Sequence, residues 1–390
     1  MNLYKYNAKW LMCIAPFRDL SVSAAYLAPF FLQKGLSLSQ IFLLQSVFSI
    51  ALLAWELPSG WLADRKGRAL CLKLSYPLDA AAIILYGFSG HFWQFIVLEL
   101  VLAVANGLMS GIDAALLLDS LKADGREDEY VRLSQRMNAL SFAATAVGVP
   151  VAVLLVHYVS IGATLVADGL LSGIGIFFVL KLVEAPRFNQ SQEAVRLSAW
   201  HAMSKLSRNA EARWLVILTS TLSTATYLGF WMSASYYGEL HIPIVLFGVI
   251  LAVRSLWKAW LSHRFVHQHH LERNMVSYAL LAGAVCIAMA SGQLWLAWLV
   301  LGHDVVQALQ GQPLTAKLNV HISHEYRATM NSLVNLVQRL AFSVAGPLVG
   351  LLVDRHGLSA GFLATGAVCS VMAFVAIARL HTFGTLRQER

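Results

Sequence analysis

Two long apolar stretches, Leu38–Leu62 and Leu70–Phe92, flank a short charged turn and limit what this chain can fold into. Each stretch is long enough to cross a bilayer as a helix, which takes about 20 residues. Residues 60–68 read Gly-Trp-Leu-Ala-Asp-Arg-Lys-Gly-Arg, so four charges fall in nine positions of a chain that is only 13% charged. We interpret this turn as a loop at one membrane face, where Gly60 and Gly67 permit a tight connection between helices.

The composition argues against a soluble enzyme. Of the 390 residues 58% are hydrophobic and the mean hydropathy is +0.62, so lipid must act as the solvent for much of the surface. The first apolar segment, Trp10–Leu32, is too long for a signal-peptide core and is expected to remain as a span. The four cysteines lack metal-ligand spacing, so we expect free thiols, no metal and no cofactor.

The apolar stretches predict an all-α membrane protein with twelve transmembrane helices in two pseudo-symmetric halves of six. We place the helices near residues 9–32, 38–62, 69–90, 92–117, 133–156, 160–183, 214–236, 243–263, 274–292, 294–316, 329–352 and 358–380. The corresponding domains are an N-terminal half at 1–184, a cytoplasmic linker at 185–213 and a C-terminal half at 214–390.

The distribution of Lys and Arg predicts the orientation. Of the 29 such residues, 23 lie in or beside the two tails and the loops that follow even-numbered helices, while only Lys34 and Arg355 lie in the other loops. Positive residues concentrate on the cytoplasmic side of membrane proteins. We therefore expect both termini in the cytoplasm, and the net charge of +8 indicates topology rather than nucleic-acid binding.

Charged residues within the predicted spans are candidates for function, because a charge in the bilayer costs about 2.5–3.5 kcal/mol on insertion scales. The alternative is that some of them form structural ion pairs. The candidates for the substrate or proton cavity are Arg18, Asp19, Glu99, Asp113, Arg254, Asp304 and Arg339, joined by Gln307 on the same helix as Asp304 and by the aromatic residues Tyr227 and Trp231. Asp79, Asp168, Lys258 and His303 are further charged or titratable residues within spans. The aromatic residues could equally be packing or interfacial anchors.

A histidine cluster in the loop after the eighth helix is the only metal-like pattern. Its members are His263, His267, His269 and His270, and the first two have the i,i+4 spacing of a helical metal site. We interpret the cluster as part of a solvated basic loop.

The turn at residues 60–68 resembles the signature G-x-L-A-D-R-x-G-R of the major facilitator superfamily. Other stretches resemble bacterial efflux-type, drug:proton antiporter-like members: Glu56-Leu57-Pro58-Ser59-Gly60, Ser110-Gly111-Ile112-Asp113-Ala114-Ala115-Leu116, Leu118-Asp119-Ser120-Leu121-Lys122 and Arg327-Ala328-Thr329. The second half carries only a degraded counterpart of the turn, at Leu261–Arg273.

The resemblance implies two halves that rock about a central site built by the first, fourth, seventh and tenth helices. It implies cavity or coupling roles for Asp19, Asp113, Tyr227 and Asp304. It also implies a cytoplasmic gate in which Asp64 and Arg68 hold that side closed, with Gly60, Arg65, Gly67 and Glu56 as the remaining gate residues. The fourth helix departs from proton-coupled members, because it offers Glu99 where they carry an arginine.

We therefore expect a secondary active transporter of the cell inner membrane that exports a small organic compound in exchange for protons, acting as a monomer. The alternative is an importer of a polar or anionic metabolite, with Arg18, Arg254 and Arg339 as counter-charges. A non-transporting sensor is a more distant alternative. An enzyme is not expected, because no nucleophile or acid–base constellation is present, and no phosphate-binding loop indicates direct use of ATP.

Overall fold

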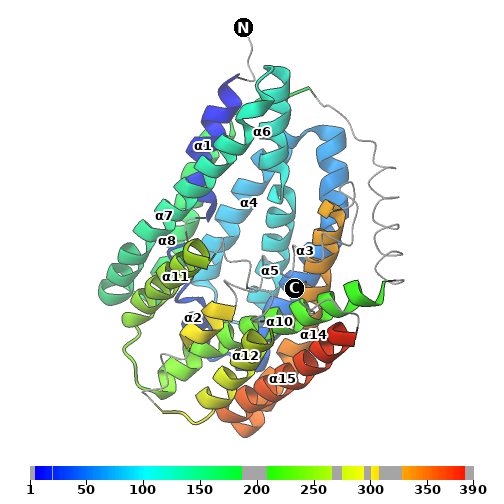
Figure 1. Cartoon of the computed structure of the whole chain (residues 1–390). Coiled ribbons are helices and arrows are strands. Elements are labelled where there is room, and N and C mark those ends of the chain that lie inside the picture. Colours follow the sequence, from blue (N-terminus) through cyan, green and yellow to red (C-terminus); the bar gives the residue numbers. More distant parts are fainter. Residues whose placement is uncertain are drawn as a thin grey trace. The chain divides into compact units, whose positions relative to one another are not determined.

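The computed structural model describes residues 5–19, 21–186, 209–265, 275–293, 300–306 and 327–382. All secondary structure in these ranges is helical (Figure 1). The helices are α1 Lys5–Asp19, α2 Leu27–Gln33, α3 Leu38–Lys66, α4 Arg68–Phe88, α5 Phe92–Met109, α6 Ile112–Ala123, η1 Glu127–Glu129, α7 Tyr130–Tyr158, α8 Ile161–Val179, α10 Ala210–Glu239, α11 Leu246–Phe265, α12 Met275–Met289, α14 Arg327–His356 and α15 Leu358–Thr382. Residues 300–306 are also helical.

The helices have the length and surface of membrane spans. Within the described residues, eight helical segments are long and apolar enough to cross a membrane. Large apolar side chains such as Phe88, Trp93 and Leu256 are more than two-thirds exposed, at 74%, 74% and 71%. Exposed apolar surface on this scale suits contact with lipid rather than water. The predicted all-α membrane fold is confirmed.

The first predicted helix, 9–32, is wrong as a continuous helix. The structure has α1 and α2 with a non-helical segment between them. In this break the Asp168 carboxylate of α8 accepts hydrogen bonds from the main-chain N–H groups of Val22 and Ser23, at 2.6 and 2.9 Å. A carboxylate that satisfies these amides removes the need for helical hydrogen bonds there.

The fourth predicted helix, 92–117, is also interrupted. Helix α5 ends at Met109 and α6 begins at Ile112, after Gly111 adopts the left-handed conformation with φ of 70°. Glycine has no Cβ and enters this conformation at no steric cost. The break places Asp113 in the first turn of a new helix.

Contacts divide the chain into two compact units. The first unit consists of Met1–Leu36, Val47–Asn189 and Ile244–Ala252. In it α4 packs against α8 and α5, and α1 packs against α7. Close packing of α4 on α8 depends on Gly169, because a Cβ at this position would lie 2.8 Å from the carbonyl oxygen of Ala80. Small residues let membrane helices approach closely in this way.

The second unit consists of Ser37–Ser46, Gln190–Pro243 and Val253–Arg390. Its main contacts join α15 to α12, α10 and α14. The buried core contains Leu218 and Leu222 of α10 together with Ala376 and Leu380 of α15. The predicted linker 185–213 lies mostly outside the described residues and stays a prediction.

Helix α3 runs through both units without a break. Its residues up to Ser46 belong to the second unit and those from Val47 onward belong to the first. At this boundary the Ser46 hydroxyl donates a hydrogen bond of 2.8 Å to the Phe42 carbonyl oxygen, one turn earlier. Helix α11 is divided in the same manner between Ala252 and Val253.

Candidate functional site

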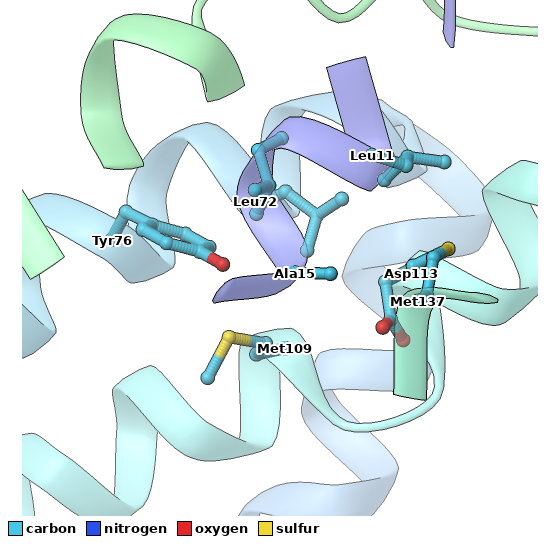
Figure 2. Close-up of a pocket in the computed structure, with 8 residues that line it drawn as sticks. Leu11, Ala15, Leu72, Tyr76, Met109, Asp113 and Met137 are labelled. Carbon is cyan, nitrogen blue, oxygen red and sulfur yellow. The ribbon is translucent and has the colours of Figure 1, made fainter. Parts of the chain in front are cut away.

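A cavity in the first unit surrounds Asp113 (Figure 2). It is lined by Leu11, Ile14 and Ala15 of α1, Leu72 and Tyr76 of α4, Met109 of α5, Asp113 of α6 and Met137 of α7. Tyr76, Met109 and Asp113 approach the same space from three different helices. The Asp113 side chain is nearly buried, at 9% exposed. The site is therefore one carboxylate in an otherwise mainly apolar enclosure.

The local sequence explains the position of Asp113. The left-handed Gly111 ends the path of α5 and restarts the chain as α6. Asp113 is the acidic residue in the first turn of α6, where the positive end of the helix dipole favours a negative charge. The enclosed space has room for about one water molecule, far less than the space that encloses a drug-sized ligand. In this conformation the cavity fits a water molecule rather than an organic molecule.

Three other acids within the spans have neutral hydrogen-bond donors as partners. Glu99 accepts a hydrogen bond of 2.8 Å from the Tyr86 hydroxyl, and Asp79 accepts one of 2.8 Å from the Ser172 hydroxyl. Asp168 holds the two main-chain amides between α1 and α2. These contacts tie Glu99, Asp79 and Asp168 to neighbouring segments of the first unit.

A charged cluster lies in the second unit. Arg254 donates two hydrogen bonds to Asp304, at 2.8 Å from Nε and 3.0 Å from Nη2. The Lys258 Nζ lies 3.8 Å from the same carboxylate. The Asp304 side chain is fully buried and that of Arg254 nearly so. The cluster thus joins two cations to one carboxylate, which is the ion pairing that the sequence left open.

The remaining predicted cavity residues are spread over the second unit and the start of the chain. Trp231 is buried, whereas Tyr227 is 49% exposed and packs its ring 5.9 Å from that of Phe342. Arg339 of α14 is half-buried. Arg18 and Asp19 lie in the last turn of α1, but their side chains are outside the described set, and Gln307 is outside the described residues altogether.

The predicted gate turn has partners that the sequence did not indicate. Gly67 joins α3 to α4 with φ of 119°. Arg68 pairs with Asp119 of α6 and donates a hydrogen bond of 2.8 Å to the Ala115 carbonyl oxygen. Glu184 accepts hydrogen bonds from the main-chain N–H groups of Arg68 and Ala69, at 2.9 and 2.8 Å. The signal for Asp119 was its place in the stretch Leu118–Lys122, whereas Glu184 had no local signal.

The other gate residues lie on the surface of the first unit. The side chains of Asp64, Arg65 and Glu56 are exposed. The Arg65 guanidinium lies 4.8 Å from the centre of the Trp61 ring, a cation–π contact.

No group of three metal ligands occurs within the described ranges. Of the histidine cluster, His267, His269 and His270 are outside those ranges, and the side chain of His263 is not described.

Residues 12–346 match the sequence model of the Major Facilitator Superfamily, which is well over half of the chain. The chain belongs to the Major Facilitator Superfamily. No curated protein sequence matches this facilitator. Family membership makes it a multi-pass membrane transporter for small molecules rather than an enzyme. The narrower resemblance to drug:proton antiporters stays a prediction.

Solved structures share the fold of this facilitator. The nucleoside transporter NupG is similar with a TM-score of 0.78 at 15% identity, over 97% of this chain and 99% of NupG. A bacterial homologue of the human lysosomal transporter Spinster gives a TM-score of 0.71 at 14% identity, over 98% and 97% of the two chains. A POT family transporter in complex with 5-aminolevulinic acid gives 0.67 at 15% identity, over 99% and 96%. These likenesses confirm the predicted major facilitator fold.

Proposed function

We propose that this facilitator is a secondary active transporter that exports a small organic compound across the inner membrane in exchange for protons. In this scheme Asp113 carries the proton. Its carboxylate takes up a proton from the outer side and gives it to the cytoplasm, and the substrate occupies the central cavity while the carboxylate is charged. The observation that carries the proposal is the cavity around Asp113.

The cavity beside Asp113 favours this acid for the role. Asp168 is bound to two main-chain amides and Asp304 is bound to Arg254. Protonation of either would break contacts that hold helices together, which costs stability. Asp113 lines a space with room for about one water molecule. A water molecule in this space would deliver the proton to the Asp113 carboxylate.

The proposed orientation follows from the Lys and Arg count. With both termini in the cytoplasm, the α3–α4 turn faces the cytoplasm and Arg68 and Asp119 form part of the gate on that side. The ion pair and the Glu184 contacts stiffen the end of the first unit that this gate would use.

The test is coupled proton flux in proteoliposomes that contain a trapped pH-sensitive dye. The substrate is first identified by comparing metabolite levels and drug susceptibility between cells that express the protein and cells in which its gene is deleted. Asp113→Asn is expected to abolish substrate-dependent proton movement. Glu99→Gln is the matched control, because this acid is on the adjacent helix and bonded to Tyr86; it is expected to retain flux. Undiminished flux in Asp113→Asn would contradict the assignment, and Asp19→Asn and Asp304→Asn would then be compared.

Import of an anionic metabolite is the second candidate function. It is favoured by the two cations Arg254 and Lys258 beside the carboxylate of Asp304, because cations within a span attract an anionic substrate. Uptake of labelled substrate by expressing cells, lost in Lys258→Gln, would favour this function over export.

A further inference from the structure

The turn between α14 and α15 is a second copy of the turn between α3 and α4. Residues 350–357 read Gly-Leu-Leu-Val-Asp-Arg-His-Gly, with Gly350, Asp354, Arg355 and Gly357 at the spacing of Gly60, Asp64, Arg65 and Gly67. The backbone repeats as well. Each turn is a single glycine between two long helices, with φ of 119° at the first glycine and 84° at the second. The expected counterpart at Leu261–Arg273 lacks this Asp-Arg-x-Gly core.

The aspartate of the second turn binds the start of α3. Asp354 Oδ1 accepts a hydrogen bond from the Leu38 main-chain N–H at 3.1 Å, and Oδ2 accepts one from the Ser39 N–H at 3.2 Å. Asp354 is more than 300 positions from Leu38 and Ser39 in sequence, but all three residues lie in the same compact unit.

The first turn of α3 is built to receive an external acceptor. The Gln40 N–H bonds to the Ser37 hydroxyl at 3.4 Å and the Ile41 N–H bonds to the Ser37 carbonyl oxygen at 3.0 Å. A helix N-terminus leaves its first amides without helical partners. In α3 the amides that still need an acceptor are those of Leu38 and Ser39. Asp354 supplies acceptors for both, and its charge suits the positive end of the helix. Because Asp354 is exposed, water can replace it when the contact opens.

Gly350, at the start of the repeated sequence in α14, lets α14 and α3 touch. A Cβ at Gly350 would lie 2.5 Å from the Cα atom of Ser39, and one at Gly346 would lie 3.2 Å from the Phe42 ring. Phe42 is fully buried, with its ring centre 6.1 Å from that of Phe342. Thus a closely packed seam of α3 and α14 lies behind the Asp354 contact.

We propose that the second turn is a latch that closes the outer side of the transporter, with Asp354 and Gly350 as its working residues. An odd number of crossings separates the two turns in this fold, so they face opposite sides of the membrane. Each face of the membrane then has one copy of the turn. The latch must release α3 whenever the outer side opens. This inference rests on the proposed function only in that a transporter opens to one side of the membrane at a time, and not on protons or on the direction of transport.

The test measures access to the seam from outside. Phe42→Cys is introduced into the full-length chain in cells with a permeabilised outer membrane, and a membrane-impermeant maleimide is added. Mass spectrometry of the peptide with residue 42 separates its labelling from that of the four natural cysteines. Asp354→Ala removes the acceptor, and Gly350→Leu wedges the helices apart. Each is expected to raise the labelling rate about fivefold or more, the factor for loss of a helix cap.

Arg355→Gln is the matched control, because it removes the neighbouring exposed charge and leaves the acceptor in place. It is expected to label like the parent. Equal labelling rates in the parent, Asp354→Ala and Gly350→Leu would overturn the latch. The measurement needs no substrate, so this failure is separate from a failure of the proton-exchange test on Asp113.

Discussion

At the scale of single residues, buried carboxylates are chiefly partners for groups that would otherwise be left unsatisfied. Asp168 binds two adjacent main-chain amides, and Asp304 binds a guanidinium. In lipid such groups have no water to bond with. An acid within a span is therefore a weak indication of transport chemistry until its partner is known.

The Arg254–Asp304 pair allows a stability prediction. Asp304→Ala leaves a buried guanidinium without its carboxylate partner, and should lower the free energy of unfolding by about 3–5 kcal/mol. Replacing both residues, as Arg254→Met with Asp304→Leu, should recover most of the loss because no guanidinium is left unpaired. Thermal unfolding of the purified protein in detergent measures both. A double variant no more stable than Asp304→Ala would contradict this account.

The candidate site was only partly predictable at this scale. Asp113 and Arg68 were identified because charges are rare in the apolar stretches and because their surroundings resemble family motifs. Glu184 and Asp168 were not assigned their roles, because each acts on main-chain amides more than 100 residues away. Every residue except proline has a main-chain amide, so the sequence does not show which amides need a side-chain acceptor.

At the scale of helices, the sequence predicted where helices occur far better than where they break. Long apolar runs must be helical in lipid, so α3, α4, α7 and α8 lie within a few residues of their predicted bounds. The break before α2 depends on a carboxylate from α8, which is a tertiary contact. The break at Gly111 had a local cue, but glycine is also common inside membrane helices.

The α4–α8 contact gives a prediction with its control on the same helix. Gly169→Ala should destabilise the protein by about 1–3 kcal/mol, because the new Cβ would lie 2.8 Å from the Ala80 carbonyl oxygen and close to Ile84. Gly173→Ala, one turn later, meets nothing within 4 Å among the described residues and should be neutral or slightly stabilising. The difference in melting temperature checks this. Equal effects of the two substitutions would show that α8 does not depend on close approach.

At the scale of the whole molecule, the two glycine turns predict opposite exposure. Cysteines placed at Lys66 and Arg355, one beside each turn, should differ in labelling by an impermeant maleimide added outside intact inner membranes. Arg355→Cys is expected to label and Lys66→Cys to label only after the membrane is broken. Labelling of both from one side would reject the proposed topology. The fold fixes the number of crossings between the two turns, and hence that they lie on opposite sides. Which of them lies outside is predicted by the Lys and Arg distribution alone.

Helix α3 has a consequence for how such a molecule can move. This unbroken helix is divided between the two compact units at Ser46 and Val47. A serine hydroxyl bonded to the carbonyl one turn earlier loosens a helix at that point and favours a bend, and Ser46 makes this bond. Near Ser46, α3 can therefore bend without losing its main-chain hydrogen bonds.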